Sequence, residues 1–119
     1  MNPLAAYKEN TVTTQSKGKT VVLLYDGAIR FLKQALACMQ AGDVAGRNER
    51  ILKAEAIIDE LDVSLNMDAG GELAANLRLL YDFMRRNLVQ ANMSQDARRV
   101  QEVISILADL NSGWRAIAV

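Results

Sequence analysis

The sequence contains no histidine, one cysteine and one proline among its 119 residues. Without histidine it cannot build a Ser-His-Asp or Cys-His catalytic arrangement, a phosphohistidine relay, or the Glu-x-x-His ligands of di-metal helical bundles. The single Cys38 excludes an internal disulfide and a multi-cysteine zinc site, and its context favours a packing role. These absences predict a protein that is not an enzyme and that uses no metal or cofactor.

Neither sign of charge is in excess, because 14 lysines and arginines balance 14 aspartates and glutamates. This balance provides no electrostatic basis for nucleic acid or an anionic membrane surface as a partner. No apolar run approaches the roughly 20 residues of a membrane span, and no basic stretch followed by an apolar run suggests a signal peptide. The sequence therefore predicts a cytoplasmic protein that binds no nucleic acid and inserts into no membrane.

Hydrophobic residues make up 50% of the chain, and strand formers do not cluster between turn signals, so most of the chain is predicted to be helical. Residues 1–16 are polar, with only isolated apolar positions, and predict a mobile or loosely docked tail. Helices are expected over about residues 20–39, 44–65, 72–91 and 94–114. Asp43 is expected to cap the second helix, and residues 66–71, which include Gly70-Gly71, are expected to break the helical pattern before the third. The short loops between them predict an all-α fold, an antiparallel up-down-up-down four-helix bundle over residues 17–119.

One segment of the first predicted helix is repeated in the third. Residues 23–35 read LLYDGAIRFLKQA and residues 79–91 read LLYDFMRRNLVQA, so both share the pattern LLYDxxxRxLxQA. The repeat aligns Tyr25 with Tyr81 and indicates two related helical hairpins. Chance similarity between amphipathic helices is the alternative interpretation.

The first predicted helix carries an apolar arc of about 180°, which is wider than the three residues in seven that a bundle helix needs. The repeat identifies the excess edge, because three apolar positions of the first helix become polar in the third. These three residues, Val22, Ile29 and Leu36, are called the first-helix stripe, and they align with Arg78, Arg85 and Asn92. The second helix carries a weaker stripe away from its main apolar face, formed by Ala45, Leu52, Ala56 and Val63.

Three kinds of cover for the first-helix stripe are open at this point. The chain's own tail, through Leu4, Tyr7 and Val12, is one, and a second copy of the protein is another. The third is an amphipathic segment of another protein, because exposed apolar strips with polar rims mark interaction sites. The first and third kinds can be combined, because the tail could occupy the groove until a segment of another protein displaces it.

The order and spacing of these motifs resembles the FliS family of flagellar export chaperones over essentially the whole chain. The resemblance is carried by Tyr7, Leu24-Tyr25-Asp26-Gly27, residues 54–65, Gly70-Gly71-Glu72-Leu73, Leu80-Tyr81-Asp82 and Trp114. It implies a cytoplasmic helical bundle that binds the C-terminal segment of flagellin, prevents its premature polymerisation and presents it to the flagellar type III export gate. It also implies that Tyr7 and Tyr25 lie beside the groove.

Taken together, the candidate partner-binding residues are Tyr7, Val22, Tyr25, Ile29, Leu36, Leu52 and Val63. The competing interpretation is a self-associating helical structural or adaptor module, with the first-helix stripe as a homodimer seam.

Overall fold

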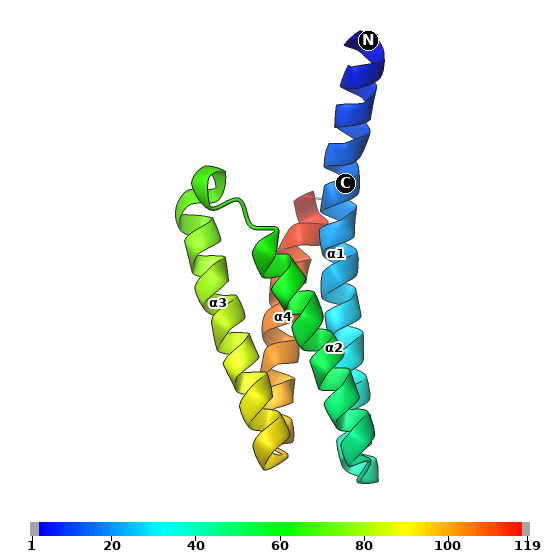
Figure 1. The fold of residues 1–119 in the computed structure, drawn as a ribbon, viewed down its shortest axis with the longest axis vertical. Helices are drawn as coiled ribbons and strands as arrows, with labels where there is room; N and C mark the ends of the chain where they lie inside the picture. Colours follow the sequence, from blue (N-terminus) through cyan, green and yellow to red (C-terminus); the bar gives the residue numbers. More distant parts are fainter. Residues whose placement is uncertain (1–2, 118–119) are drawn as a thin grey trace.

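The computed structural model describes the backbone of residues 3–117 and the side chains of residues 18–116. Over this part of the chain the elements are α1 (Pro3–Ala41), α2 (Val44–Val63), α3 (Met67–Ser94) and α4 (Ala97–Ile117), with no strand. Figure 1 shows that helices adjacent in the chain run antiparallel. Helices α1 and α3 each contact both α2 and α4, so α1 and α3 lie on one diagonal. The predicted all-α, up-down-up-down four-helix bundle is confirmed.

Helix α1 begins at Pro3, whereas the sequence predicted its start near Thr20. Proline is tolerated in the first turn of a helix, where its missing N–H would have no intrahelical partner. No further proline follows, and the next glycine is Gly18, so no strong helix breaker interrupts the segment. The side chains of residues 1–17 lie outside the described residues. The loose docking of residues 1–16, and a boundary between tail and bundle at residue 17, stay predictions.

Polar side chains cap the two central helices at the places where the sequence breaks its apolar pattern. The Asp43 carboxylate accepts a hydrogen bond from the backbone N–H of Gly46 at 2.9 Å, as predicted for the start of α2. Asn66 caps α3 in the same way, accepting from the N–H of Ala69 at 3.0 Å. The predicted break at Gly70-Gly71 is a kink within α3, because Gly71 has φ 55° and ψ −131°, a conformation that favours glycine.

Apolar side chains from all four helices fill the centre of the bundle. The largest fully buried ones are Tyr25, Tyr81, Leu32, Ile51, Ile58, Met84, Leu88, Leu107, Val100 and Val103. Burying a side chain of leucine size contributes about 1.5–3 kcal/mol, so this core dominates the stability of the fold. The aligned tyrosines of the repeat meet here, which shows that the two hairpins place equivalent residues in one core.

Candidate partner-binding site

The first-helix stripe lies on the side of α1 that faces α4. Asp26, on the same side of α1, accepts hydrogen bonds from the Asn111 amide at 2.8 Å and the Arg115 guanidinium at 2.6 Å. Within the stripe Val22 is only 9% exposed, and Ile29 and Leu36 are partly buried against the core. The first-helix stripe is thus partly covered beside α4, while Ile29 also lines an open hollow of about 470 Å³ together with Asp26 and Arg30. That the stripe binds a partner stays a prediction.

Tyr25 is fully buried, so the expectation that it lies beside an open groove is corrected. Its hydroxyl lies 2.6 Å from the hydroxyl of Tyr81, and its ring centroid lies 6.5 Å from that of Trp114. Burial raises the pKa of Tyr25, although its hydrogen bond with Tyr81 acts in the opposite direction. Tyr25 is a core residue in this conformation. The side chain of Tyr7 lies outside the described residues.

The polar residues that replace the stripe on α3 bond side chains of α2 and remain partly exposed. The Arg78 guanidinium bonds the Asp62 carboxylate at 2.9 Å, and Arg85 bonds Asp62 at 3.1 Å and Asp59 at 3.2 Å. Arg85 also pairs with Asp82 on its own helix. These contacts, together with Asn92 and its partners below, are called the polar seam. The bundle thus has a mainly apolar seam between α1 and α4, in which Asp26 bonds Asn111 and Arg115, and a polar seam between α2 and α3.

Charge pairing in the polar seam changes the ionisation of Asp62. Burial by itself would raise the pKa of this carboxyl, but hydrogen bonds from Arg78 and Arg85 and the charges of both guanidinium groups outweigh it. The net effect is a pKa below the usual aspartate range. Asp62 therefore stays ionised and holds the upper half of the seam together.

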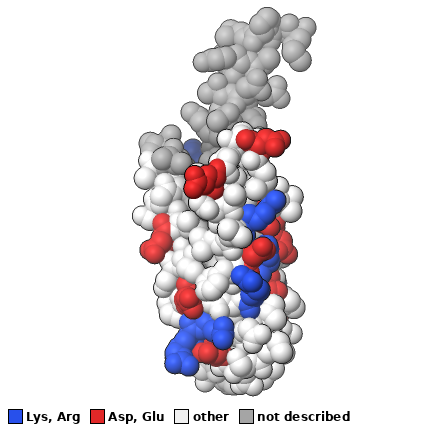
Figure 2. All heavy atoms as spheres, turned by 90° about the vertical axis from the view of Figure 1, so that its left-hand side faces the viewer, with Lys and Arg blue, Asp and Glu red and all other residues white. Residues whose placement is uncertain are grey.

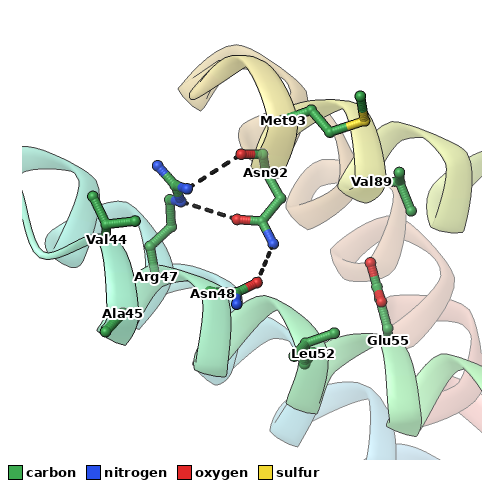
Figure 3. Close-up of a pocket in the computed structure, with 9 residues that line it drawn as sticks. All are labelled: Val44, Ala45, Arg47, Asn48, Leu52, Glu55, Val89, Asn92 and Met93. Carbon is green, nitrogen blue, oxygen red and sulfur yellow. Dashed lines mark hydrogen bonds between the residues drawn. The ribbon is translucent and has the colours of Figure 1, made fainter.

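An open hollow of about 560 Å³ lies beside the lower half of the polar seam and is called the α2–α3 groove (Figure 3). Its lining residues are Val44, Ala45, Arg47, Asn48, Leu52 and Glu55 from α2, and Val89, Asn92 and Met93 from α3. Leu52 is 54% exposed and Met93 is 75% exposed, which is unusual for apolar side chains of this size. Leu52 was predicted from the sequence to lie off the core, and it does.

Hydrogen bonds join the two helices at one side of the groove. Arg47 donates through Nε to the Asn92 side-chain oxygen at 3.0 Å and through Nη2 to the Asn92 backbone carbonyl at 3.2 Å. The Asn92 amide in turn donates to the Asn48 side chain (Figure 3). Arg47 is buried, so this network fixes the spacing of α2 and α3 and leaves the apolar walls free to accept a ligand.

Glu55 is the acidic group of the groove. Its side chain is half-buried, and no hydrogen bond or ion pair from a described residue reaches its carboxylate. Burial raises the pKa of Glu55, and the negative charge of Asp59 raises it further. The carboxylate is thus held next to apolar walls without a cation of its own.

Further exposed apolar residues extend the surface beyond the groove. They are Val63, 83% exposed near the end of α2, and Leu79 and Phe83 on α3. Figure 2 shows the α3 side of the molecule, with charged groups on both edges and a largely uncharged surface across its centre. Of the residues predicted to bind a partner, Leu52 and Val63 lie on this side. Sequence reasoning missed Val89 and Met93, although their i, i+4 spacing on α3 is a detectable signal.

The described residues define a helical-bundle protein with an exposed apolar site of the kind that accepts an amphipathic segment. Among the side chains described, no group of three or more metal-ligating residues comes together. None of the helices over the described range combines the length and apolar character that crossing a membrane requires.

Comparison with known proteins names the family. A family model described as "Flagellar protein FliS" matches residues 1–119, and the chain belongs to this family. It is 36% identical over 114 residues to the flagellar secretion chaperone FliS of Bacillus subtilis (strain 168), covering 96% of this chain and 84% of the relative. It is 41% identical over 118 residues to that of Vibrio cholerae, covering 96% of this chain and 87% of the relative. The resemblance that the sequence indicated is confirmed.

The fold is also known from a solved structure. A crystal structure described as a flagellar chaperone from bacteria superposes with a TM-score of 0.82 at 21% identity. The match covers 97% of this chain and 96% of that one, so the whole bundle shares its architecture.

Proposed function

We propose that this protein is a cytoplasmic, non-catalytic export chaperone that binds the C-terminal segment of flagellin. It prevents premature polymerisation of flagellin and delivers it to the export gate of the flagellar type III apparatus. The observation that carries the proposal is the exposed apolar α2–α3 groove in a chain of the FliS family. Relatives are named flagellar secretion chaperones, and a chaperone needs a surface for the chain that it escorts.

The groove suits a segment that is disordered when free and helical in its polymer. Such a segment exposes an apolar face in water, and contact with Leu52, Val89 and Met93 removes that face from solution. Each buried side chain contributes at most about 1.5–3 kcal/mol, and ordering the segment opposes this gain. We therefore expect the segment to extend past the groove, toward Val63 or toward Leu79 and Phe83.

Self-association through the first-helix stripe was the competing interpretation. It rests on the first-helix stripe, of which Val22 is 9% exposed and Ile29 and Leu36 are partly buried against the core. The stripe therefore offers a second copy less apolar surface than the α2–α3 groove offers a flagellin segment.

The test is capture of the flagellin C-terminal segment by the purified protein, together with delay of flagellin polymerisation. Leu52→Glu places a charge in the groove and should weaken capture at least about tenfold. Leu23→Glu on α1 is the matched control, because Leu23 is 68% exposed and lies outside the groove. Both variants should keep the helicity and melting temperature of the wild type.

Two results would count against the proposal in different ways. Wild-type protein that neither captures the segment nor delays polymerisation refutes the function. Capture that is equally strong in both variants would show that flagellin binds elsewhere on the bundle.

A further inference from the structure

The α2–α3 groove is apolar with one unpaired acidic group. In Figure 3 Glu55 and Leu52 extend from α2 toward the side of the groove where Val89 lies on α3. A partly buried carboxylate without a counter-charge is unfavourable, because burial removes water without replacing its hydrogen bonds. The raised pKa of Glu55 reports that penalty. Any ligand that supplies a cation here relieves it.

Several cations of α2 and α3 bond other groups of the chain. Arg47, the cation of the groove lining, is buried and bonds the neutral Asn92, Arg78 bonds Asp62, and Arg85 is shared by carboxylates of both helices. Lys53, two residues before Glu55, pairs with Glu49 at 3.1 Å on another side of α2. None of these cations pairs with Glu55, so its carboxylate is left for a cation of the ligand.

We propose that the α2–α3 groove selects an amphipathic helix with a lysine or arginine at the edge of its apolar face. The cation pairs with Glu55, while aliphatic side chains one turn away contact Leu52, Val89 and Met93. This inference rests on the proposed function and adds to it a chemical requirement for the bound segment of flagellin. A purely aliphatic segment would leave Glu55 buried and unpaired, so the carboxylate discriminates against it.

The choice of a positively charged helix over a second copy of this chain follows from charge. A second copy docked groove to groove would bring a second Glu55, and the cation of its groove, Arg47, is buried and held by Asn92. Like charges brought together oppose association. A basic residue of another protein meets no such repulsion.

The experiment compares Glu55→Gln with wild type in binding the C-terminal segment of flagellin from the same cell, at low and high salt. We expect Glu55→Gln to weaken binding about tenfold at low salt and to flatten the salt dependence. Its melting temperature should equal or exceed that of the wild type, because the unpaired charge is gone. Glu60→Gln is the matched control, since Glu60 is exposed on the same helix and does not line the groove.

Replacing each lysine and arginine of the segment by glutamine, one at a time, identifies the partner of Glu55. One replacement should weaken binding to wild type and leave binding to Glu55→Gln unchanged, which is the signature of a direct pair in a double-mutant cycle. If every replacement acts equally on both proteins, the proposed pair does not exist.

The outcomes separate this inference from the proposed function. If Glu55→Gln binds like wild type while Leu52→Glu does not bind, the groove holds flagellin and the charge requirement is wrong. If wild type binds no flagellin segment, both fail together. A protein that is dimeric without the segment, and becomes monomeric on Leu52→Glu, would assign the groove to a second copy and overturn the inference.

Discussion

The hydroxyl groups of Tyr25 and Tyr81 lie 2.6 Å apart in the buried centre of the bundle, 56 residues apart in the chain. The two residues occupy the same position in the repeated segment. They belong to α1 and α3, which are diagonal helices whose backbones do not approach each other over the described residues. The hydrogen bond therefore joins the two hairpins directly across the core.

Removing both hydroxyls of this pair should cost less stability than the two single removals added together. Tyr81→Phe leaves the Tyr25 hydroxyl buried without its partner at 2.6 Å and should lower the free energy of unfolding by about 1–2 kcal/mol. The double variant Tyr25→Phe/Tyr81→Phe should lose less than the sum of the single variants. Urea denaturation of the three variants measures this, and strictly additive losses would contradict a direct pair.

Alkaline pH should destabilise the protein through the same residues. Burial is the largest cause that raises the pKa of both Tyr25 and Tyr81 above the usual value. Their contribution to stability is complete below the unfolded pKa of about 10 and is lost as pH rises above it. In a Tyr7→Phe background, tyrosinate absorbance should appear only with unfolding. A simple titration near pH 10 in the folded protein would show that the pair is accessible.

Acid should open the polar seam. The folded pKa of Asp62 lies below its unfolded value, so its contribution is present above about pH 4 and is lost as pH falls through the folded pKa. The free energy of unfolding should decline below about pH 4, and Asp62→Asn should make that decline shallower. Denaturation across the acid range tests this, and an unchanged slope in the variant would assign acid sensitivity to other carboxylates.

The seam between α1 and α4 should tolerate charge poorly. Ile29→Arg places a guanidinium where an apolar side chain packs against the core and should lower the free energy of unfolding by about 2–4 kcal/mol. Leu23→Arg, on the exposed side of the same helix, should change it little. Wild-type stability of Ile29→Arg would show that the stripe is open after all.

The sequence predicted the helices and their order because apolar periodicity and capping residues are local signals. Asp43 caps α2 as expected, and Leu52 and Val63 are exposed as their place away from the apolar face indicated. The cover of the first-helix stripe stayed open at the level of the sequence, because periodicity measures the width of an apolar face and not which neighbour covers it. The hydrogen bond between Asp26 and Asn111 of α4 illustrates the missing information. It joins residues that are 85 apart in the sequence, and a pattern within one helix does not reveal such a contact.

The groove was only half predicted for a similar reason. Leu52 comes from a pattern within one helix, whereas the hollow exists because Val89 and Met93 of α3 stand opposite it. Their position relative to Leu52 depends on the polar seam, in which Arg47 of α2 bonds Asn92 of α3. The sequence pattern of a single helix does not determine the distance between α2 and α3.

The α1–α4 seam and the α2–α3 seam differ in chemistry. The two related hairpins therefore cannot replace each other in the bundle. If two copies of the first hairpin combined, Asp59 and Asp62 of α2 would meet Val22 and Ile29 of the other copy. If two copies of the second hairpin combined, Arg78 and Arg85 would face α4. Residues 57–61 of α2 resemble residues 106–110 of α4, and this alignment puts Asn111 in place of Asp62. In both cases ionised groups would lose the partners that they have across the α2–α3 seam. Despite the internal likeness, this difference favours pairing of each hairpin with its unlike counterpart.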